Sequence, residues 1–250
     1  MKYLGIEPIR PRVAVFDFTC CEGCELQLAN KEQTLADFLQ AVEIVNFREI
    51  SSTRSDSYEI ALIEGSITRS DEVDRLMRIR ERARVLVALG SCACFGGVNR
   101  IKNSHDLLQA NREVYGDHPK PTLPVRSVKE VVEVDLEIPG CPVSKDEVER
   151  IIQHLIWDVP YHFPAYPVCL ECKQRFTVCM FEQGQLCLGP ITQAGCNAPC
   201  PAAGLGCWGC RGPAEEPNYD EFLAIARRRG FQEREIQERL HFFGGFEVLR

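Results

Sequence analysis

The 250-residue sequence lacks the features that mark several large classes of protein. No apolar run approaches the roughly 20 residues that a membrane-spanning helix needs, so we expect no direct membrane insertion. The opening residues MKYLGIEPIRPRVAVFDF contain no basic segment followed by a signal-like apolar stretch. These absences predict a cytoplasmic protein, unless a partner subunit carries an export signal.

Motifs for nucleotide and nucleic-acid binding are also missing. We find no phosphate loop, no glycine-rich dinucleotide fingerprint and no nucleophile–histidine pair. The net charge is −7, and no stripe of Lys and Arg is interleaved with aromatic residues. This pattern argues against nucleic acid as a partner.

What the sequence does contain is cysteine, with 14 residues in total. Disulfide scaffolds reach such a density in short secreted chains, whereas this chain is long and shows no secretion signal. In a reducing compartment, so many cysteines are better explained as metal ligands.

The first 160 residues alternate short apolar runs with segments of helical spacing. The runs predict strands at 13–18, 60–63, 85–89 and 134–138, and the other pattern predicts helices at 26–42, 71–83 and 148–157. Thr68 or Ser70 is expected to cap the second helix, and the segment from Ser144 to Glu147 has the form of a capping box for the third. The expected buried face of the first helix consists of Leu26, Leu35, Phe38, Leu39 and Val42. Strands alternating with helices indicate an α/β fold, with a parallel sheet covered on both faces.

The composition and the hydrophobic periodicity of the sequence change near Pro160. Residues 161–215 hold eight cysteines among many Gly and Pro residues and show little periodicity. A segment so poor in regular structure needs another source of stability, which bound metal can supply. Residues 216–250 are predicted to form two short helices separated by Gly230. We therefore expect three parts: 1–160, 161–215 and 216–250.

Four cysteines follow the predicted strands of the first part. Cys21 and Cys24 form a CxxC pair after the first strand, and Cys92 and Cys141 follow two later strands. Parallel sheets place ligands beyond the carboxyl ends of their strands. These four thiolates can hold one [4Fe–4S] cluster, which usually takes four cysteines, but their spacing suits a zinc ion at least as well.

The remaining ligand candidates lie in the second part: Cys169, Cys172, Cys179, Cys187, Cys196, Cys200, Cys207 and Cys210. Eight thiolates match two four-cysteine sites without remainder. Two CxxC pairs occur among them, and zinc ribbons use the same pairs. Counting therefore predicts two further metal sites without identifying the metal.

Several motifs together resemble the small subunit of [NiFe] hydrogenases and the related 20 kDa subunit family of NADH:ubiquinone oxidoreductase. They are Cys21-Glu-Gly-Cys24, Gly90-Ser-Cys-Ala93 with Gly96-Gly97, and Pro139-Gly-Cys-Pro142. The tail is most similar to the delta subunit of cytosolic NAD(P)-linked sulfhydrogenases, in Tyr166-Pro-Val-Cys-Leu-Glu-Cys172, Cys187-Leu-Gly-Pro190, Ala194-Gly-Cys-Asn197 and Cys210-Arg-Gly212. The resemblance covers nearly the whole chain.

The resemblance implies a flavodoxin-like, doubly wound first domain followed by an irregular iron–sulfur domain. It also implies three [4Fe–4S] clusters. The proximal cluster would be bound by Cys21, Cys24, Cys92 and Cys141. The distal cluster would be bound by Cys169, Cys172, Cys179 and Cys187, with Cys169 at a position where many relatives have histidine. The medial cluster would be bound by Cys196, Cys200, Cys207 and Cys210, and the additional Cys200 favours four irons over three.

The function that this resemblance implies is electron transfer within a cytosolic bidirectional hydrogenase. The chain would relay electrons between the nickel–iron centre of a large subunit and a flavin or iron–sulfur subunit that reacts with NAD(P). It would be inactive alone. Two alternatives stay open: a complex-I-like electron-transfer subunit, against which the eight-cysteine tail argues, and a zinc-stabilised interaction protein.

Two cysteines and two glutamates are left over. Cys20 and Cys94 are interpreted as small buried thiols, although Cys20 is a possible substitute for Cys24 as a ligand. Glu22, between two ligands, is expected to be a solvated or interface carboxylate. Glu64 ends the second predicted strand, where either turn stabilisation or a proton or hydrogen-bonding role is possible.

Overall fold

The computed structural model describes residues 10–30 and 41–246, and the chain divides into two compact units, residues 1–161 and 162–250. The division falls one residue beyond the boundary expected from the sequence. Residues 216–246, expected as a separate part, lie within the second unit.

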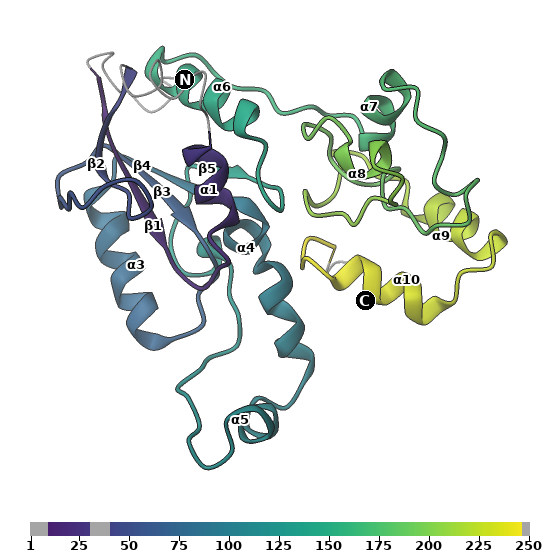
Figure 1. Cartoon of the computed structure of the whole chain (residues 1–250), viewed down its shortest axis with the longest axis horizontal. Coiled ribbons are helices and arrows are strands. Elements are labelled where there is room, and N and C mark those ends of the chain that lie inside the picture. The colour runs from purple at the N-terminus through teal and green to yellow at the C-terminus, as the bar shows by residue number, and fades with distance from the viewer. Residues whose placement is uncertain (1–9, 31–40, 247–250) are drawn as a thin grey trace. The chain divides into compact units, whose positions relative to one another are not determined.

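The first unit is built on a five-stranded, all-parallel sheet (Figure 1). Its strands are β1 (Arg12–Asp17), β2 (Glu43–Asn46), β3 (Ile60–Glu64), β4 (Val85–Leu89) and β5 (Leu136–Ile138). Their spatial order, β2-β1-β3-β4-β5, is that of flavodoxin-like folds. The α/β prediction is therefore confirmed, and β2, which is short and polar at both ends, is the strand that it missed.

The register of the sheet brings four strand ends to one level. Asp17 lies opposite Glu64, Glu64 opposite Leu89, and Leu89 opposite Ile138. Because all these strands run in the same direction, the chain leaves β1, β3, β4 and β5 at one edge of the sheet.

Both faces of the sheet are covered. On one face, Ala14, Ile63 and Leu86 pack against Leu76 and Ile79 of helix α3 (Ser70–Arg82). Successive strand residues point to opposite faces, and the alternate residues of β1, β3 and β4 are also buried. The other helices in the described part of this unit are α1 (Gly23–Ala29), α4 (Gly90–Phe95), α5 (Leu107–Tyr115) and α6 (Lys145–Ile156), with 3₁₀ helices η1 (Gly97–Ser104) and η2 (Val128–Glu130).

The helix expected at 26–42 is wrong in its extent and in part of its face. Helix α1 ends at Ala29, and Leu26 is 45% exposed because its side chain lies on the outer side of this short helix. Val42 is fully buried as expected, whereas Leu35, Phe38 and Leu39 lie outside the described residues.

Of the two helix caps predicted from the sequence, the one at α6 is confirmed and the one at α3 is wrong. The Ser144 side chain accepts a hydrogen bond from the Glu147 N–H at the start of α6, as expected. Neither Thr68 nor Ser70 caps α3. Instead the Glu72 carboxylate turns back and accepts from the backbone N–H groups of Thr68 and Arg69, at 2.8 and 3.1 Å.

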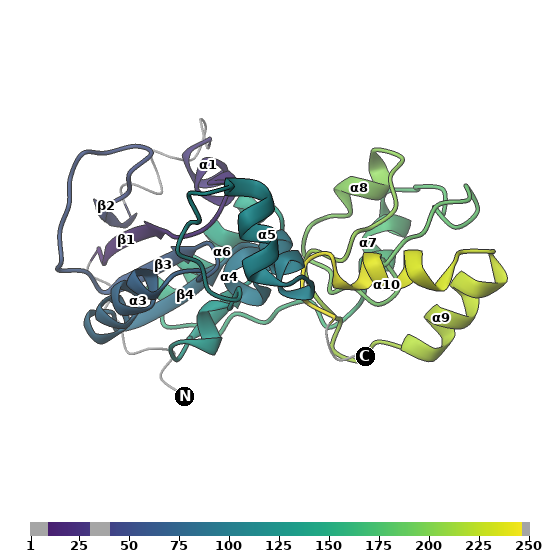
Figure 2. The ribbon, with the colours of Figure 1, turned by 90° about the horizontal axis from the view of Figure 1, so that it is seen from below.

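The second unit contains little regular structure. Its helices are α7 (Val168–Gln174), α8 (Pro199–Ala202), α9 (Tyr219–Arg228) and α10 (Glu233–His241). The last two pack against each other and against the irregular segment, through Phe222, Ile236 and Leu240 with Leu186 and Leu188 (Figure 2). None of the described helices of either unit is both long and apolar enough to cross a membrane.

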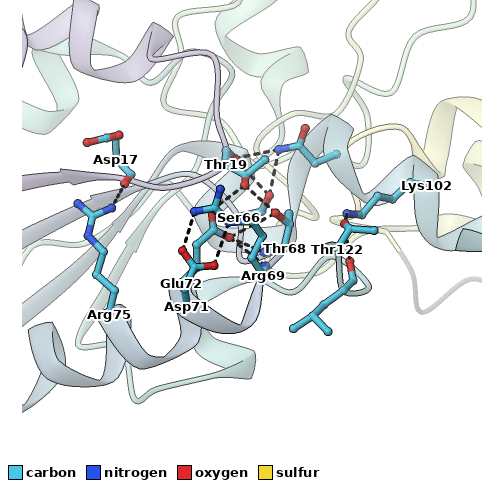
Figure 3. A network of polar contacts seen from close by, with 12 residues as sticks. Asp17, Thr19, Ser66, Thr68, Arg69, Asp71, Glu72, Arg75, Lys102 and Thr122 are labelled. Atoms are coloured by element: carbon cyan, nitrogen blue, oxygen red, sulfur yellow. Dashed lines mark hydrogen bonds and ion pairs between the residues drawn. The ribbon is translucent and has the colours of Figure 1, made fainter. Parts of the chain in front are cut away.

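A polar network ties together the loops that leave the sheet (Figure 3). The Thr19 hydroxyl donates to Glu72 at 3.0 Å and lies 2.8 Å from the hydroxyl of Thr68. Asn99 donates to the Thr19 carbonyl and to the Ser66 hydroxyl, both at 2.9 Å. These hydrogen bonds hold together Thr19, the segment from Ser66 to Glu72, and Asn99. Thr19 directly precedes Cys20 and Cys21 in the chain.

Replacement of Glu72 by alanine tests this network. Glu72 is 6% exposed, and its loss leaves two backbone N–H groups and the Thr19 hydroxyl without their acceptor. Unsatisfied buried donors cost about 1–3 kcal/mol each, so we expect the free energy of unfolding of Glu72→Ala to fall by about 2–4 kcal/mol in urea titrations. Asp71→Ala is the control, because Asp71 makes only an exposed ion pair with Arg69, and its loss should cost less than about 1 kcal/mol. Equal losses in the two variants would contradict the role given to Glu72.

Candidate metal centres

The first group of cysteines lies at the level edge of the sheet. Cys21 follows β1, Cys92 lies within α4 directly after β4, and Cys141 follows β5. Cys24 lies within α1 and is buried. The structure therefore brings together residues separated by up to 120 positions.

These four side chains are close enough to influence one another electrostatically. Burial raises the pKa of Cys92 to about 12, and Cys141 and Cys21 add to the rise. Burial also raises the pKa of Cys24, with contributions from Glu64, Cys141 and Cys92. The thiolate form that ligates metal is thus disfavoured unless positive charge enters the group.

Two glycines allow the backbone to approach these sulfur atoms. Gly90 has φ +85°, and a Cβ placed on it would lie 2.5 Å from Cys24 Sγ. Gly97 has φ +62°, and its Cβ would lie 2.6 Å from Cys92 Sγ. Only glycine adopts this backbone conformation readily and leaves that space free. The donor set and the space around it therefore fit a cysteine-ligated metal group.

Glu64 fixes the helix that carries Cys24. Its carboxylate oxygens accept from the backbone N–H groups of Cys24 and Glu25, at 3.1 and 2.7 Å. Burial raises the pKa of Glu64, and the two amides oppose that rise. Of the two roles considered for Glu64 from the sequence, the structure shows a hydrogen-bonding one: its side chain caps a helix that has no side-chain cap of its own.

Two further carboxylates lie nearby. Glu25 is 1% exposed, and among the described residues neither of its side-chain oxygens has a hydrogen-bond partner. Burial, together with Glu64 and Asp17, raises its pKa to about 8. Glu22, interpreted from the sequence as a solvated or interface carboxylate, forms an ion pair with Arg48, which also contacts Asp17 at 3.2 Å.

The two surplus cysteines differ from each other. Cys94 is fully buried, and its thiol lies 3.6 Å from the Ala88 carbonyl oxygen, as expected of a small buried residue. Cys20 is only partly buried, so its description as a buried thiol is wrong. Its pKa is raised to about 12, chiefly by burial.

In the second unit, Cys169, Cys172, Cys179 and Cys187 lie close to one another. Burial raises the pKa of Cys169 to about 12, with contributions from Cys187, Cys172 and Cys179. The space beside Gly189 lies between Cys187 Sγ and Cys169 Sγ, at 3.3 and 3.5 Å from a Cβ placed there. Helix α7 supplies the Cys169–Cys172 pair, and Cys179 is exposed.

The other four cysteines form two neighbouring pairs. Cys200 contributes to the raised pKa of Cys196, and Cys210 to that of Cys207. Arg211 lies near a member of each pair. It directly follows Cys210 in the chain, it is 1% exposed, and it is close enough to Cys196 to oppose the rise of the Cys196 pKa. The Cys207 N–H also donates to Cys187 Sγ at 3.2 Å, so the two groups of four adjoin.

Glu171 connects these two groups, a role that no sequence pattern indicates. It lies between Cys169 and Cys172 in α7, yet its carboxylate accepts from the backbone N–H groups of Gly195 and Ala198, at 2.8 and 3.2 Å. Those two residues flank Cys196. One buried side chain therefore positions the loop of the second group from within the CxxC pair of the first.

Across residues 10–30 and 41–246, no three His, Cys, Asp or Glu side chains converge as they would around a single ion. The choice between zinc and an iron–sulfur group therefore depends on the relatives of the chain.

Replacement of Glu171 by alanine should disturb both groups of the second unit. Loss of the carboxylate leaves two backbone donors unsatisfied next to Cys196, at about 1–3 kcal/mol each. We expect a lower thermal unfolding midpoint and less bound metal per chain. Glu182→Ala is the control, because Glu182 lies in the same irregular segment and forms only an exposed ion pair, with Arg229 at the end of α9. Unchanged metal content in Glu171→Ala would contradict the connecting role.

Comparisons with known proteins identify relatives along nearly the whole chain. The delta subunit of sulfhydrogenase 2 from Pyrococcus furiosus is 36% identical over 237 residues, which cover 93% of this chain and 98% of that subunit. The delta subunit of the NAD-reducing hydrogenase HoxS from Cupriavidus necator is 26% identical and covers 62% of this chain and 82% of its own length.

Solved structures of hydrogenases share the fold. A chain of an NAD⁺-reducing [NiFe]-hydrogenase in the H₂-reduced state superposes with a TM-score of 0.57 at 27% identity, over 62% of this chain and 96% of that one. A chain of the Ni-Fe-Se hydrogenase from Desulfomicrobium baculatum has a TM-score of 0.56 at 16% identity, over 85% of this chain, and shows likeness of fold alone.

The family described as NADH ubiquinone oxidoreductase, 20 Kd subunit, matches residues 21–155, which include the four cysteines at the sheet edge. The eight-cysteine segment lies beyond that match and within the reach of the sulfhydrogenase delta subunit. The chain thus belongs to the NADH ubiquinone oxidoreductase 20 Kd subunit family, together with the delta subunits of hydrogenases.

Proposed function

We propose that the chain is the electron-transfer small subunit of a cytosolic [NiFe] hydrogenase linked to NAD(P). One observation carries most of this proposal: four cysteines gathered at the end of a flavodoxin-like sheet, in a chain that aligns over 93% of its length with a sulfhydrogenase delta subunit. The names of the HoxS relative and of the NAD⁺-reducing structure support NAD⁺ as the terminal electron acceptor.

In this proposal three [4Fe–4S] clusters are held as the sequence predicts. Cys21, Cys24, Cys92 and Cys141 hold the proximal cluster; Cys169, Cys172, Cys179 and Cys187 the distal; and Cys196, Cys200, Cys207 and Cys210 the medial. Such groups supply one-electron redox steps at these positions. The grouping of the first and second sets in the structure supports this division, and Arg211 near both medial pairs is consistent with the third.

The residues of the chain itself then have definite tasks. Glu64 holds Cys24 at the sheet edge, the loop network around Glu72 holds the approach to Cys21, and Glu171 holds the loop of Cys196. Each proposed set includes one buried cysteine, namely Cys24, Cys187 or Cys207, whereas Cys21, Cys141 and Cys179 are exposed. In the direction of hydrogen oxidation, a large subunit with a nickel–iron centre converts H₂ into two protons and two electrons. The electrons then pass through this chain to a flavin or iron–sulfur subunit, where NAD(P)⁺ takes up two electrons and one proton.

A complex-I-like role and a zinc-stabilised role remain the competing functions. The family match to complex I ends at residue 155, before the eight-cysteine segment, which favours the hydrogenase assignment. The zinc alternative is separated by composition. Anaerobically purified chain should contain about twelve iron and about twelve acid-labile sulfide ions, as three four-iron clusters require. Zinc without sulfide would overturn the proposal and the complex-I-like alternative together.

The assignment of Cys200 to a four-iron medial cluster has its own test. Cys200→Ala removes one of four ligands, so we expect the iron content to fall by about one per chain and the EPR signal of an oxidised three-iron cluster to appear. Cys94→Ala, at a buried thiol outside the proposed ligand sets, should leave both the iron content and the spectrum unchanged. If Cys200→Ala keeps the full iron content, Cys200 is not a ligand.

A further inference from the structure

An aromatic residue that is both strained and exposed lies two residues beyond the end of helix α7. Phe176 has φ +54°, and its side chain is 95% exposed. The Thr177 N–H donates to the Cys172 carbonyl at 3.2 Å, and the Phe176 N–H donates to the Lys173 carbonyl at 3.0 Å. This pair of bonds is the Schellman termination of a helix, in which the left-handed position is usually glycine.

Phenylalanine is an unfavourable choice at this position for two separate reasons. A residue with a Cβ pays for the left-handed conformation that glycine adopts freely. A large apolar ring in water gains nothing from burial. The isolated chain therefore bears both the strained backbone and the exposed ring. Burial of the ring against a partner protein would offset these two costs.

Two other exposed apolar residues lie within six positions of Phe176 in the sequence. Leu170 is 44% exposed and Val178 is 59% exposed. Together with Lys173 and Arg175, they and Phe176 form what we call the α7 rim. The rim is interleaved in sequence with Cys169, Cys172 and Cys179, three of the four proposed distal ligands, and Cys179 is itself exposed.

The charge of the α7 rim differs from that of the whole chain. Lys173 and Arg175 are exposed cations, in a protein whose net charge is −7. Arg175 is held in place by donating to the Asn197 carbonyl at 2.9 Å. Lys173 lies near enough to Cys169 to oppose the rise of its pKa. An apolar centre edged with cations is complementary to an apolar socket edged with carboxylates.

We propose that the α7 rim is the docking surface for the electron-accepting subunit, with Phe176 inserted into an apolar, acidic-edged socket of that protein. The inference depends on the proposed function, because it takes Cys179 to belong to the site from which electrons leave. Electron transfer weakens steeply with distance, so an acceptor must approach where this set reaches the surface. Aromatic residues in such positions commonly carry a large share of binding energy.

Phe176→Gly tests the docking surface because stability and binding should change in opposite directions. Glycine relieves the backbone strain, so the unfolding midpoint of the full chain should rise or stay the same. In the hydrogenase complex purified through a tag on the large subunit, the flavin-to-nickel ratio should fall as salt is raised. H₂-dependent reduction of NAD⁺ and NADP⁺ should fall by about tenfold or more, as expected for an aromatic hot spot. H₂-dependent reduction of methyl viologen, a small diffusible dye, should be retained.

The matched control is Asp158→Gly. Asp158 is also exposed and left-handed, with φ +53°, but it lies in the first unit beyond α6 and carries no apolar ring. Its replacement should leave the flavin-to-nickel ratio and all three reactions at wild-type levels. Val178→Ser, which leaves the backbone of the helix end unchanged, should weaken flavin retention in the same direction as Phe176→Gly.

The outcomes separate the two proposals. If the wild-type complex reduces NAD(P)⁺ and Phe176→Gly does so equally well at all salt concentrations, the docking surface is wrong and the proposed function stands. Loss of the large subunit instead of the flavin subunit also overturns the docking surface. If the wild-type complex contains no distal cluster by EPR, or reduces neither NAD⁺ nor NADP⁺, the proposed function fails and the docking surface fails with it.

Discussion

The structure depends on gathering sulfur donors in groups in which burial disfavours the thiolate form. Burial raises the pKa of Cys24, Cys92, Cys169 and Cys207, and neighbouring thiols raise these pKa values further. Thiolates in such positions are stable only when bound cations offset their charge. Under the proposed function, metal binding and folding form one equilibrium in the second unit, where regular structure is scarce. The first unit differs, because the register of its sheet brings together the strand ends that carry its cysteines without any metal.

Three buried glutamates hold the segments that carry these sulfur donors. Glu64, Glu72 and Glu171 each accept hydrogen bonds from two backbone N–H groups, and in each case the side chain joins segments that are distant in sequence. Hydrogen bonds to a charged acceptor are stronger than neutral ones, which suits loops that have little apolar surface to bury. Fixed loops in turn keep the ligand geometry defined before metal is bound.

Much of the first unit could be predicted from the sequence, because β1, β3 and β4 are continuous apolar runs bounded by turns. Strand β2 could not, since only one of its four residues is buried. Leu26 was misplaced because α1 is too short for helical periodicity to define a buried face. The cysteine groups at the sheet edge followed from strand ends and spacing. A hydrogen-bonding role was considered for Glu64, but its partners were not predicted, and the role of Glu171 was not predicted at all. The partners of both side chains lie 24 or more residues away and leave no local pattern.

The position of Glu171 has a consequence for how the protein matures. Its side chain belongs by sequence to one four-cysteine group and by its hydrogen bonds to the loop of the next. Ordering α7 around the first group places the carboxylate that organises the second, so under the proposed function we expect the two groups to assemble cooperatively. We then expect damage at either one, whether by oxidation or by mutation, to be transmitted to the other.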